Sequence, residues 1–392
     1  ELGLSSLGGN ACWVDINGDG FTDLCAGGAV WINDKGQKFH KVADAGASVS
    51  ADFDNDGDID LLQAFVHGGL DLGEGRSTIT VNQGASKSYK LKWDMTRLKR
   101  KDPQSFHLGD MDAAWFDFDN DGWQDCAYGE NVYLPATDRV FMFHQNPTAH
   151  DFDDMTEAIG MLKYMPCHIT RPCDFDLDGD EDLIIGWKNG LSMIRNDVGK
   201  KNNFVEIKLE APQGVNRNAI GARITVYAGG MAQIRDVLTG QGHFGAQQPL
   251  EKLFGLGKAT SIDSIVVHWP HKTLANTVVV NPPINQFLII NENGLSKTFA
   301  VGVSEQPSSI EHGMTITPNP AQGLLRLTLP TADHNGGIVS ITNVLGGEIL
   351  SRVVPPQTPE LSVPLDELSV GTYFVTVRLD NGTSYSRPFM KR

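Results

Sequence analysis

Four nine-residue acidic segments constrain this chain more than any other feature of its sequence. They align without gaps and share the pattern D-x-[DN]-x-D-G-x-x-D. The four are residues 15–23 (DINGDGFTD), 52–60 (DFDNDGDID), 117–125 (DFDNDGWQD) and 174–182 (DFDLDGDED). Because the spacing of acids and glycine is the same in each, we expect all four to form the same turn.

These segments contain the oxygen ligands of a calcium site. Acids at positions 1, 3 and 5 converge only where the chain curls tightly, and the glycine at position 6 permits that curl. The carbonyl of position 7 and the acid at position 9 would complete a shell of about six to eight oxygens, which calcium prefers. We therefore expect about four calcium ions. The predicted ligands are Asp15, Asn17, Asp19, Phe21, Asp23, Asp52, Asp54, Asp56, Asp58, Asp60, Asp117, Asp119, Asp121, Trp123, Asp125, Asp174, Asp176, Asp178, Asp180 and Asp182.

The alternative is a solvated acidic turn without an ion. Carboxylates about 5 Å apart repel by roughly 3 kcal/mol per pair at an effective dielectric of about 20, so several of them would hold the turn open. The pattern therefore favours a counter-ion, and calcium over magnesium, which prefers a tighter octahedron. The first segment has Asn17 in place of an acid and is predicted to bind most weakly.

The charge of the chain is concentrated in these segments. They hold 18 of the 48 Asp and Glu residues, and the remaining 30 nearly balance the 32 Lys and Arg residues. The formal charge of −16 thus indicates local cation sites and not an acidic tail. No basic stripe indicates nucleic-acid binding, and no apolar run reaches the roughly 18 residues of a membrane-spanning helix.

The segments also predict the fold class. Strand-like stretches follow all four of them and precede the first three, whereas ITRPC before the fourth is a weaker strand signal. The segments start 37, 65 and 57 residues apart, about the length of a four-stranded propeller blade. We therefore predict an all-β chain in which residues 1–203 form calcium-binding β-propeller blades. Four blades are few, so either the propeller is small or Glu1 lies within a longer parent chain.

The pattern changes after the fourth segment. Residues 204–292 alternate apolar and polar residues in strands such as FVEIKL and SIVVHW. Residues 293–314 are polar and rich in serine and glycine, and are predicted to be a linker. Residues 315–392 again contain short strands separated by turn residues, which predicts a small β-sandwich.

Two resemblances carry these expectations further. The acidic segments and their flanks, notably AAWFDFDNDGWQD, resemble the FG-GAP/VCBS repeats of integrin-α-like propellers. Residues 204–292 resemble the ASPIC/UnbV domain, which follows such propellers in cartilage acidic protein and bacterial relatives. The matching stretches are NRNAIGARITVYAGG, QIRDVLTGQGHFGAQ, LFGLG and IDSIVVHWP. That family lends no chemistry to the chain.

A third resemblance concerns localisation. Residues 315–392 resemble the type A sorting domain of the type IX secretion system of Bacteroidetes, through ITPNPAQG, GTYFVTVRLDNG and the basic end MKR. The resemblance implies an Ig-like sandwich that a PorV-type carrier recognises and a sortase then removes. It also implies an extracellular location, or one on the outer-membrane surface, of a Gram-negative bacterium.

The five cysteines leave their pairing open. Cys12 and Cys25 flank the first segment, and Cys167 and Cys173 lie six residues apart, so either pair could bridge in an oxidising compartment. Buried free thiols are equally expected.

No catalytic motif is present, since HExxH, GxSxG and the P-loop are all missing from the sequence. His150, Asp151 and Asp153 could form an acid/base cluster, but a solvated turn is the favoured interpretation. His243 is likewise expected in a turn.

The tryptophans near the segments have two expected roles. Trp13, Trp115 and Trp187 are expected to pack between blades, whereas Trp123 lies within its segment and should be more exposed. Trp123 is therefore a candidate for stacking on a sugar or a partner.

These features favour a secreted or surface-attached, non-catalytic module for adhesion or binding, with a glycan or surface-protein ligand. One alternative is a polysaccharide-acting lyase or hydrolase, which should show a deep pocket with carboxylates or a Lys or His base outside the acidic segments. The other is a structural subunit of a surface assembly, which should oligomerise. The sequence names neither a ligand nor an oligomeric state.

Overall fold

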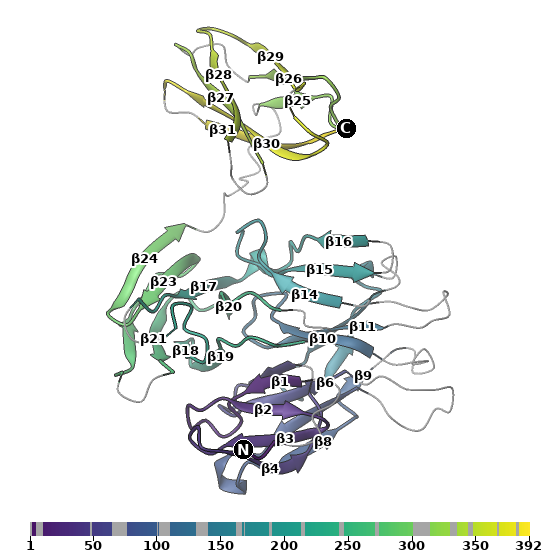
Figure 1. Cartoon of the computed structure of the whole chain (residues 1–392), viewed down its shortest axis with the longest axis vertical. Coiled ribbons are helices and arrows are strands. Elements are labelled where there is room, and N and C mark those ends of the chain that lie inside the picture. The colour runs from purple at the N-terminus through teal and green to yellow at the C-terminus, as the bar shows by residue number, and fades with distance from the viewer. Residues whose placement is uncertain are drawn as a thin grey trace. The chain divides into compact units, whose positions relative to one another are not determined.

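The computed structural model describes residues 2–4, 11–47, 49–64, 77–99, 101, 110–130, 140–161, 167, 169–187, 190–212, 216–242, 247–270, 274–300, 314–329, 335–343, 348–366, 368–381 and 384–392. The chain divides into two compact units, Glu1–Val303 and Ser304–Arg392, which are described separately. Both consist of strands (Figure 1), and the described helical turns, η1 (Ala85–Lys87) and η4 (Gly199–Lys201), are short. The all-β prediction is therefore confirmed. No helix in the described part of the chain is long and apolar enough to cross a membrane.

The first part of unit 1 consists of four sheets, here called sheets 1 to 4, which are antiparallel except for one strand of sheet 3. One acidic segment connects the first two strands of each sheet, and these segments are here called loops 1 to 4. Sheet 1 contains β1 (Ala11–Val14), β2 (Asp23–Ala26), β3 (Ala29–Asn33) and β4 (Phe39–Asp44), and sheet 2 contains β5 (Val49–Ala51), β6 (Asp60–Gln63), β7 (Thr78–Asn82) and β8 (Leu91–Asp94). Sheet 3 contains β10 (Asp110–Phe116), β11 (Asp125–Glu130), β12 (Val140–Gln145) and β13 (Phe152–Asp154), with β9 (Leu98–Lys99) parallel to β13. Sheet 4 contains β14 (Ile169–Cys173), β15 (Asp182–Trp187) and β16 (Gly190–Ile194).

Every loop joins the first two strands of its sheet in the same register. The residue before position 1 pairs with the aspartate at position 9, for example Val14 with Asp23 and Phe116 with Asp125. Residues 169–173 (ITRPC), which gave the weaker strand signal, form β14, and Cys173 pairs with Asp182 in the same register. The stretch LCAGGAVWI is a hairpin of two strands, because Gly27 and Gly28 have positive φ and turn the chain between β2 and β3.

Consecutive sheets pack through apolar side chains that alternate along the second strand of each sheet. In β6, Leu61 faces sheet 1 and belongs to one buried cluster, whereas the next residue, Leu62, faces sheet 3 and belongs to another. A third cluster joins sheets 3 and 4 through residues such as Ala127 and Leu183. Blades of a propeller are expected to stack in this order, and the propeller itself stays a prediction.

The second part of unit 1 has two further sheets around one core. One sheet has the order β20 (Lys252–Gly257), β17 (Asn203–Leu209), β23 (Gln286–Asn291) and β24 (Gly294–Ala300). The other has the order β19 (Met231–Asp236), β18 (Arg223–Ala228), β21 (Ile262–His268) and β22 (Thr277–Val280). Val205, Ile224 and Ile265 are among the fully buried residues between them.

The predicted linker over 293–314 is wrong in its first part. Residues 294–300 form β24, which pairs with β23 along its length. The sequence GLSKTFA has polar residues between Leu295 and Phe299, and on an edge strand those polar residues face solvent. Residues 301–313 lie outside the described part of the chain.

Unit 2 has two antiparallel sheets around an apolar core that includes Leu327, Val339 and Val375. The first sheet contains β25 (Thr315–Thr317), β26 (Leu324–Thr328) and β29 (Glu360–Pro364), and the second contains β28 (Glu348–Val354), β27 (Gly337–Asn343), β30 (Gly371–Leu379) and β31 (Ser384–Lys391). This arrangement agrees with the predicted sandwich at the level of two packed sheets.

Candidate metal centres

Each acidic loop is organised around its first aspartate. Asp15 accepts hydrogen bonds from the backbone N–H groups of Asp19 and Gly20, at 3.1 and 3.0 Å. Asp52, Asp117 and Asp174 accept the equivalent bonds from positions 5 and 6 of their own loops, at 2.8–3.2 Å. In each loop the carboxylate at position 5 accepts the N–H of position 7. The four segments therefore form the same turn, as predicted.

Two positions in each loop have left-handed backbone. The glycines at position 6 have φ of 81°, 95°, 96° and 91°, which glycine adopts without a steric cost. Position 4 is left-handed as well, and Gly18, Asn55 and Asn120 tolerate it there. Leu177 takes the same position in loop 4 with φ of 56°, at a cost of about 1–2 kcal/mol.

Replacing Leu177 with asparagine should therefore stabilise the protein, by about 0.5–1 kcal/mol in a urea unfolding curve, since asparagine tolerates this conformation better. Little packing is lost, because Leu177 is 55% exposed. The matched variant Asn55→Leu places leucine at the same position of loop 2 and should destabilise the protein. A lower unfolding midpoint for Leu177→Asn would show that contacts of the leucine outweigh its backbone strain.

The aspartate at position 9 connects its loop to the end of the sheet. One oxygen of Asp23, Asp60, Asp125 and Asp182 accepts the backbone N–H of Asn33, Asn82, Gln145 and Asn196, respectively, at 2.7–2.8 Å. In loops 1, 3 and 4 the other oxygen accepts the N–H of position 2, at 3.1–3.2 Å. In loop 2 the other oxygen, Oδ2 of Asp60, is buried and has no hydrogen-bond partner.

Carboxylate oxygens converge in three of the four loops. In each group one ligand atom per residue lies within 4.8 Å of the others. The groups are Asp52, Asp54 and Asp60; Asp117, Asp119 and Asp121; Asp119, Asp125 and His144; and Asp174, Asp176 and Asp182. Three of these groups consist of hard oxygen donors alone, a kind of set that can chelate a divalent cation, and the group with His144 adds a ring nitrogen. Loop 1, with Asn17 in place of an acid, contributes no such group among the described residues.

The other predicted ligands have different surroundings. Asp178 forms an ion pair with Lys200 at 2.7 Å, and the Asp58 side chain lies against Gly84. Asn17 donates a hydrogen bond to Asp19 at 3.2 Å. For Asp56 and for the carbonyls of Phe21, Asp58, Trp123 and Asp180, ligation stays a prediction.

The electrostatics of the loops oppose full ionisation of these acids. Burial, reinforced by Asp56 and Asp54, raises the pKa of Asp52 to about 7. Burial likewise raises the pKa of Asp182 to about 7, and places the pKa of Asp60 well above its ordinary value. The protein's own side chains thus supply too little positive charge to these loops.

Loop 3 has an additional polar neighbour that sequence reasoning missed. Nε2 of His144, in β12, lies 3.4 Å from Asp119, and the hydrogen bond to this carboxylate raises the pKa of the imidazole. The histidine directly precedes Gln145, whose backbone binds Asp125. That adjacency is the only sequence signal that could have identified it.

Side-chain amides link the loops to one another, a second feature that sequence reasoning missed. Asn82 donates to the carbonyls of Ile59 in its own loop and Ile16 in the preceding loop. Gln145 donates in the same way to the carbonyls of Gln124 in loop 3 and Phe53 in loop 2. Asn196 donates to the carbonyls of Glu181 in loop 4 and Phe118 in loop 3. In the opposite direction, Asn55 donates to the carbonyl of Gly122 and Asn120 to that of Gly179, each at position 6 of the next loop.

The second part of unit 1 packs directly on the loops. Arg223 donates to the backbone carbonyl of Asp15 at 3.2 Å while it pairs with Asp236 at 2.7 and 2.9 Å. Gly255 in β20 passes so close to loop 3 that a side chain there would collide with Asp117. A side chain at Gly179 would collide with the Phe204 ring in the same manner. These contacts fix the loops from outside their own sheets.

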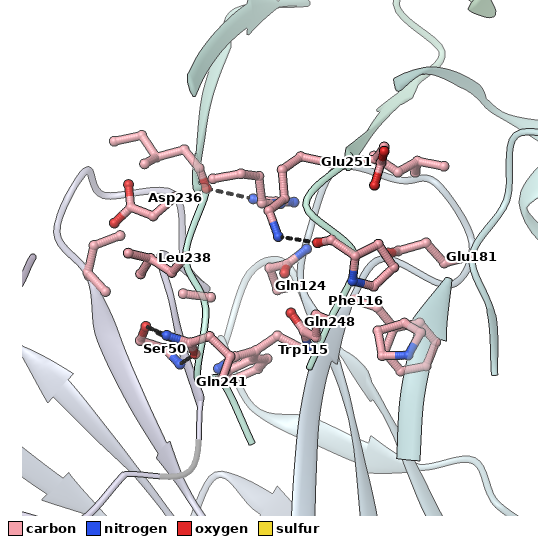
Figure 2. A pocket seen from close by; sticks show the side chains of 18 residues that line it. Ser50, Trp115, Phe116, Gln124, Glu181, Asp236, Leu238, Gln241, Gln248 and Glu251 are labelled. Carbon is pink, nitrogen blue, oxygen red and sulfur yellow. Dashed lines mark hydrogen bonds between the residues drawn. The ribbon is translucent and has the colours of Figure 1, made fainter. Parts of the chain in front are cut away.

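A small polar cavity of ≈ 60 Å³ lies where the first strands of sheets 2 to 4 meet β19 and β20 (Figure 2). Its lining includes Arg235, Lys252 and Glu181. Burial lowers the pKa of Lys252 to about 8 and raises that of Glu181 to about 7. Lys252 donates to the carbonyl of Pro249 at 2.9 Å.

Of the other histidine candidates, the structure describes only His150, which lies in a turn. His150 has a positive φ in a turn and lies 3.1 Å from Gln145, while Asp151 and Asp153 face Lys99 at 2.6 and 3.8 Å. These contacts agree with the predicted turn. His243 lies outside the described residues.

The tryptophans divide differently from the prediction. Trp115 is buried between sheets 2 and 3 and stacks on Phe53, as predicted. Trp123 is half-buried beside His150, and is more exposed than Trp115, as predicted. The prediction for Trp13 is wrong: its side chain is 39% exposed, because alternation along β1 places Cys12 and Val14 in the core instead. The side chain of Trp187 lies outside the described part.

No disulfide joins the five cysteines, all of which lie in the described part of the chain. Cys12 and Cys25 lie opposite each other in β1 and β2, and both are buried. Cys167 and Cys126 are buried as well, and Cys173 is partly exposed. They pack as small apolar side chains.

Two stretches of the chain match known families. Residues 212–297 match the ASPIC and UnbV family, and residues 315–391 match the secretion system C-terminal sorting domain. Both domains are therefore confirmed. The sorting domain indicates a secreted or cell-surface protein of the kind that the type IX system exports in Bacteroidetes. Neither match includes sheets 1 to 4, so the FG-GAP/VCBS resemblance stays a prediction.

Solved structures resemble the chain only distantly. Two are extracellular domains from B. thetaiotaomicron, one described as part of a hybrid two-component system and one as part of a one-component system. They are 11% and 10% identical to this chain, and each has a TM-score of 0.24. Each match covers 95% of this chain, and they cover 48% and 47% of the other chains. A third is dimeric latent PorU from Porphyromonas gingivalis, with 10% identity, 97% of this chain and 34% of that chain covered, and a TM-score of 0.17. The chain spans less than half the length of each, and likeness this low defines neither fold nor function. No curated protein matches the chain.

Proposed function

We propose that this chain is a secreted, calcium-stabilised binding module in which loops 1 to 4 are calcium sites on consecutive propeller blades. Asp60 supports this most strongly. Its Oδ2 is buried without a hydrogen-bond partner, in a group with Asp52 and Asp54. A buried polar atom without a partner costs about 1–3 kcal/mol, and more when it is charged. A cation at this point would remove that cost, and a set of oxygen donors alone suits calcium.

The remaining loops fit the same ion. Loops 3 and 4 have converging carboxylates at the equivalent positions, and Oδ1 of Asp119 is a further buried oxygen without a partner. Loop 1 has the same backbone turn with one carboxylate fewer, so its site is the weakest. Bound calcium would neutralise the acids and hold each turn closed.

Calcium has a structural role in this proposal, and the loops present the binding surface. The turns are linked to one another and to the ASPIC/UnbV domain, so ions in them would make one rigid face. A glycan or a bacterial surface protein is the proposed ligand. The half-buried ring of Trp123 is available for stacking at loop 3.

Catalysis is the less favoured alternative. Lys252 and Glu181 have the shifted pKa values that an acid/base pair in an enzyme would need, but Glu181 is itself position 8 of loop 4. Their cavity of ≈ 60 Å³ is far smaller than the roughly 300–1,000 Å³ of ligand pockets, so a sugar substrate does not fit between them. We therefore propose a non-catalytic protein.

A structural role in a surface assembly has one observation in its favour. On sheet 4, Leu191 and Met193 are 76% and 53% exposed, and Phe175 at position 2 of loop 4 is 44% exposed. The equivalent residues of loops 1 to 3, Ile16, Phe53 and Phe118, are buried by the next sheet. An apolar face of this kind is typical of protein–protein contacts.

Export follows from the sorting domain at 315–391. We propose that a PorV-type carrier of the type IX machinery recognises this domain and that a sortase then removes it. The module would then act outside the cell or on the outer-membrane surface.

The test is an array of glycans and bacterial surface proteins probed with the full chain, in calcium and after chelation. We expect at least one ligand whose binding is lost on chelation, because the loops shape the binding surface. The Asp263→Asn variant, altered at an exposed acid outside the loops, should bind like the wild type. An empty array in both conditions would contradict the binding function and favour the surface-assembly or enzyme alternative.

A further inference from the structure

A second pocket lies between loop 4 and the outer face of the sheet that contains β17. Its volume is ≈ 390 Å³, within the range of about 300–1,000 Å³ that holds small ligands. The walls are mostly apolar. The lining residues are Cys173, Asp174, Leu177, Glu206, Pro249, Glu251, Phe287 and Phe299.

Strand register explains how the floor of this pocket forms. Glu206 in β17 pairs with Leu253 on one side and with Phe287 on the other, and Phe287 pairs with Phe299 in β24. Directly paired residues point to the same face of a sheet, so these side chains form one row. Val205 and Ile207, the neighbours of Glu206 in sequence, point to the opposite face and belong to the core.

Glu206 is the unusual member of this row. Its side chain is 6% exposed, it lines the pocket, and its Oε2 has no hydrogen-bond partner. Lys208 on the same strand is paired with Glu251 at 3.0 Å. A carboxylate is rarely buried without a paired charge, because removing it from water costs several kcal/mol.

The surrounding charge adds to this imbalance. Burial, with further contributions from Asp174, Glu181 and Glu251, raises the pKa of Glu206 to about 8. The charged residues that line the pocket, Asp174, Glu206 and Glu251, are all acids, so a bound cation would favour the ionised form of Glu206.

The aromatic rings specify what kind of cation fits. Phe287 and Phe299 lie with ring centroids 6.1 Å apart at 59° to each other, and Phe299 is 50% exposed. Phenyl faces attract organic cations through cation–π interaction, and such rings beside a carboxylate are used to recognise ammonium groups. Of the lining acids, Glu251 is paired with Lys208 and Asp174 accepts two hydrogen bonds within loop 4. A bare metal ion would therefore find few free oxygens here, and an anion would be repelled.

We propose that this pocket binds a small organic cation, an ammonium group that carries an apolar substituent. The ammonium contacts Glu206, and the substituent lies against Phe287, Phe299 and Leu177. This site is separate from the glycan or surface-protein contact proposed above, and its recognition chemistry does not require an ion in loop 4.

The test is calorimetric titration of the full chain in calcium with three probes of similar shape: benzylammonium, benzyl alcohol and benzoate. We expect benzylammonium to bind with a dissociation constant of about 0.1–1 mM, as suits a ligand of this size. Benzyl alcohol should bind at least about tenfold more weakly, and benzoate should not bind. Equal affinity for the alcohol, or no saturable binding of benzylammonium, would overturn the proposal.

Variants locate the binding. Glu206→Gln preserves the shape and should weaken benzylammonium binding about tenfold, with its effect on benzyl alcohol small. Its fold should survive, because an amide of the same shape replaces a carboxyl group whose Oε2 has no hydrogen-bond partner to lose. Phe299→Ala should weaken both probes, whereas Tyr227→Ala, a similarly exposed aromatic on β18, should change neither. Equal binding by Glu206→Gln and the wild type would place the probe elsewhere.

This outcome is independent of the calcium proposal. Benzylammonium binding without any calcium effect on stability would contradict only the calcium sites. A calcium-dependent melt without benzylammonium binding would contradict only this pocket.

Discussion

Chelation of calcium is expected to lower the melting temperature of unit 1 by about 10 °C or more. A ligand that binds only the folded state stabilises it by about 2.7 kcal/mol when present at 100 times its dissociation constant. Two such sites contribute about 5 kcal/mol, and about 2 °C follows from each kcal/mol for a unit that spans Glu1–Val303. Loops 2 and 4 hold the most acids and should supply most of the effect. Calorimetry with and without a chelator measures it.

The variant Asp60→Asn makes this prediction specific to one loop. Asparagine keeps the Oδ1 that accepts the N–H of Asn82 but removes the charge of the oxygen without a partner. Native mass spectrometry should show one calcium ion fewer, and chelation should shift the melt less. The exposed Asp263→Asn should retain all ions. A wild-type melt that is unmoved by chelation would refute the calcium sites.

The fall in melting temperature that chelation causes should become larger as pH rises. Without calcium, the pKa of Asp52 and Asp182 is raised from 3.8 to about 7 by folding. The stability that these groups contribute is complete below pH 3.8 and is lost as pH rises through about 7. With calcium bound, stability should instead rise with pH, because protons compete with the ion for the carboxylates at low pH. When melting temperature is plotted against pH, the values with calcium and with chelator should therefore diverge between about pH 4 and pH 8.

Asp112→Ala should destabilise unit 1 by about 3–5 kcal/mol even when calcium is bound. Asp112 in β10 accepts two hydrogen bonds from Arg171 in β14, at 2.7 and 2.9 Å, and a third from the backbone of Thr170 at 2.9 Å. Both charged side chains are buried between sheets 3 and 4. Removing the carboxylate leaves the guanidinium buried without its counter-charge, which is the costly case. Denaturant unfolding in calcium measures the loss.

A double variant separates the pair from general damage. Asp112→Ala with Arg171→Met removes both charges and should recover part of the lost stability, because no buried charge is then unpaired. Asp197→Ala breaks the exposed pair with Arg195 and should cost less than about 0.5 kcal/mol. A loss for Asp112→Ala as small as that for Asp197→Ala would contradict the expected role of the buried pair.

The turns of the four loops could be predicted from sequence because their chemistry is local. Gly122 has to adopt a positive φ, and Asp117 has to accept two nearby N–H groups, whatever surrounds the loop. The amide bridges could not be predicted in the same way. Gln145 lies 92 residues from Phe53, and only the packing of sheet 3 on sheet 2 brings the two together.

The errors have physical causes of the same kind. The sequence predicts that Trp13, which flanks loop 1, packs between blades, but strand alternation at β1 buries Cys12 and Val14 and turns the indole outward. Residues 294–300 have a linker-like composition, yet pairing with β23 makes them a strand. Glu206 gave no signal at all, because one acid within FVEIKL is typical of an ordinary half-exposed strand.

The amide bridges make the loops a one-dimensional series of coupled units, in which each turn is held partly by its neighbours. Loops 2 and 3 are bridged on both sides, whereas loops 1 and 4 are bridged on one. In such a series opening begins at the terminal units and proceeds inward, so the amides of the central turns exchange with solvent last. If calcium occupies the loops as proposed, loss of the ion from loop 4 would loosen loop 3 as well, so the occupancy of one site would affect its neighbours along the series.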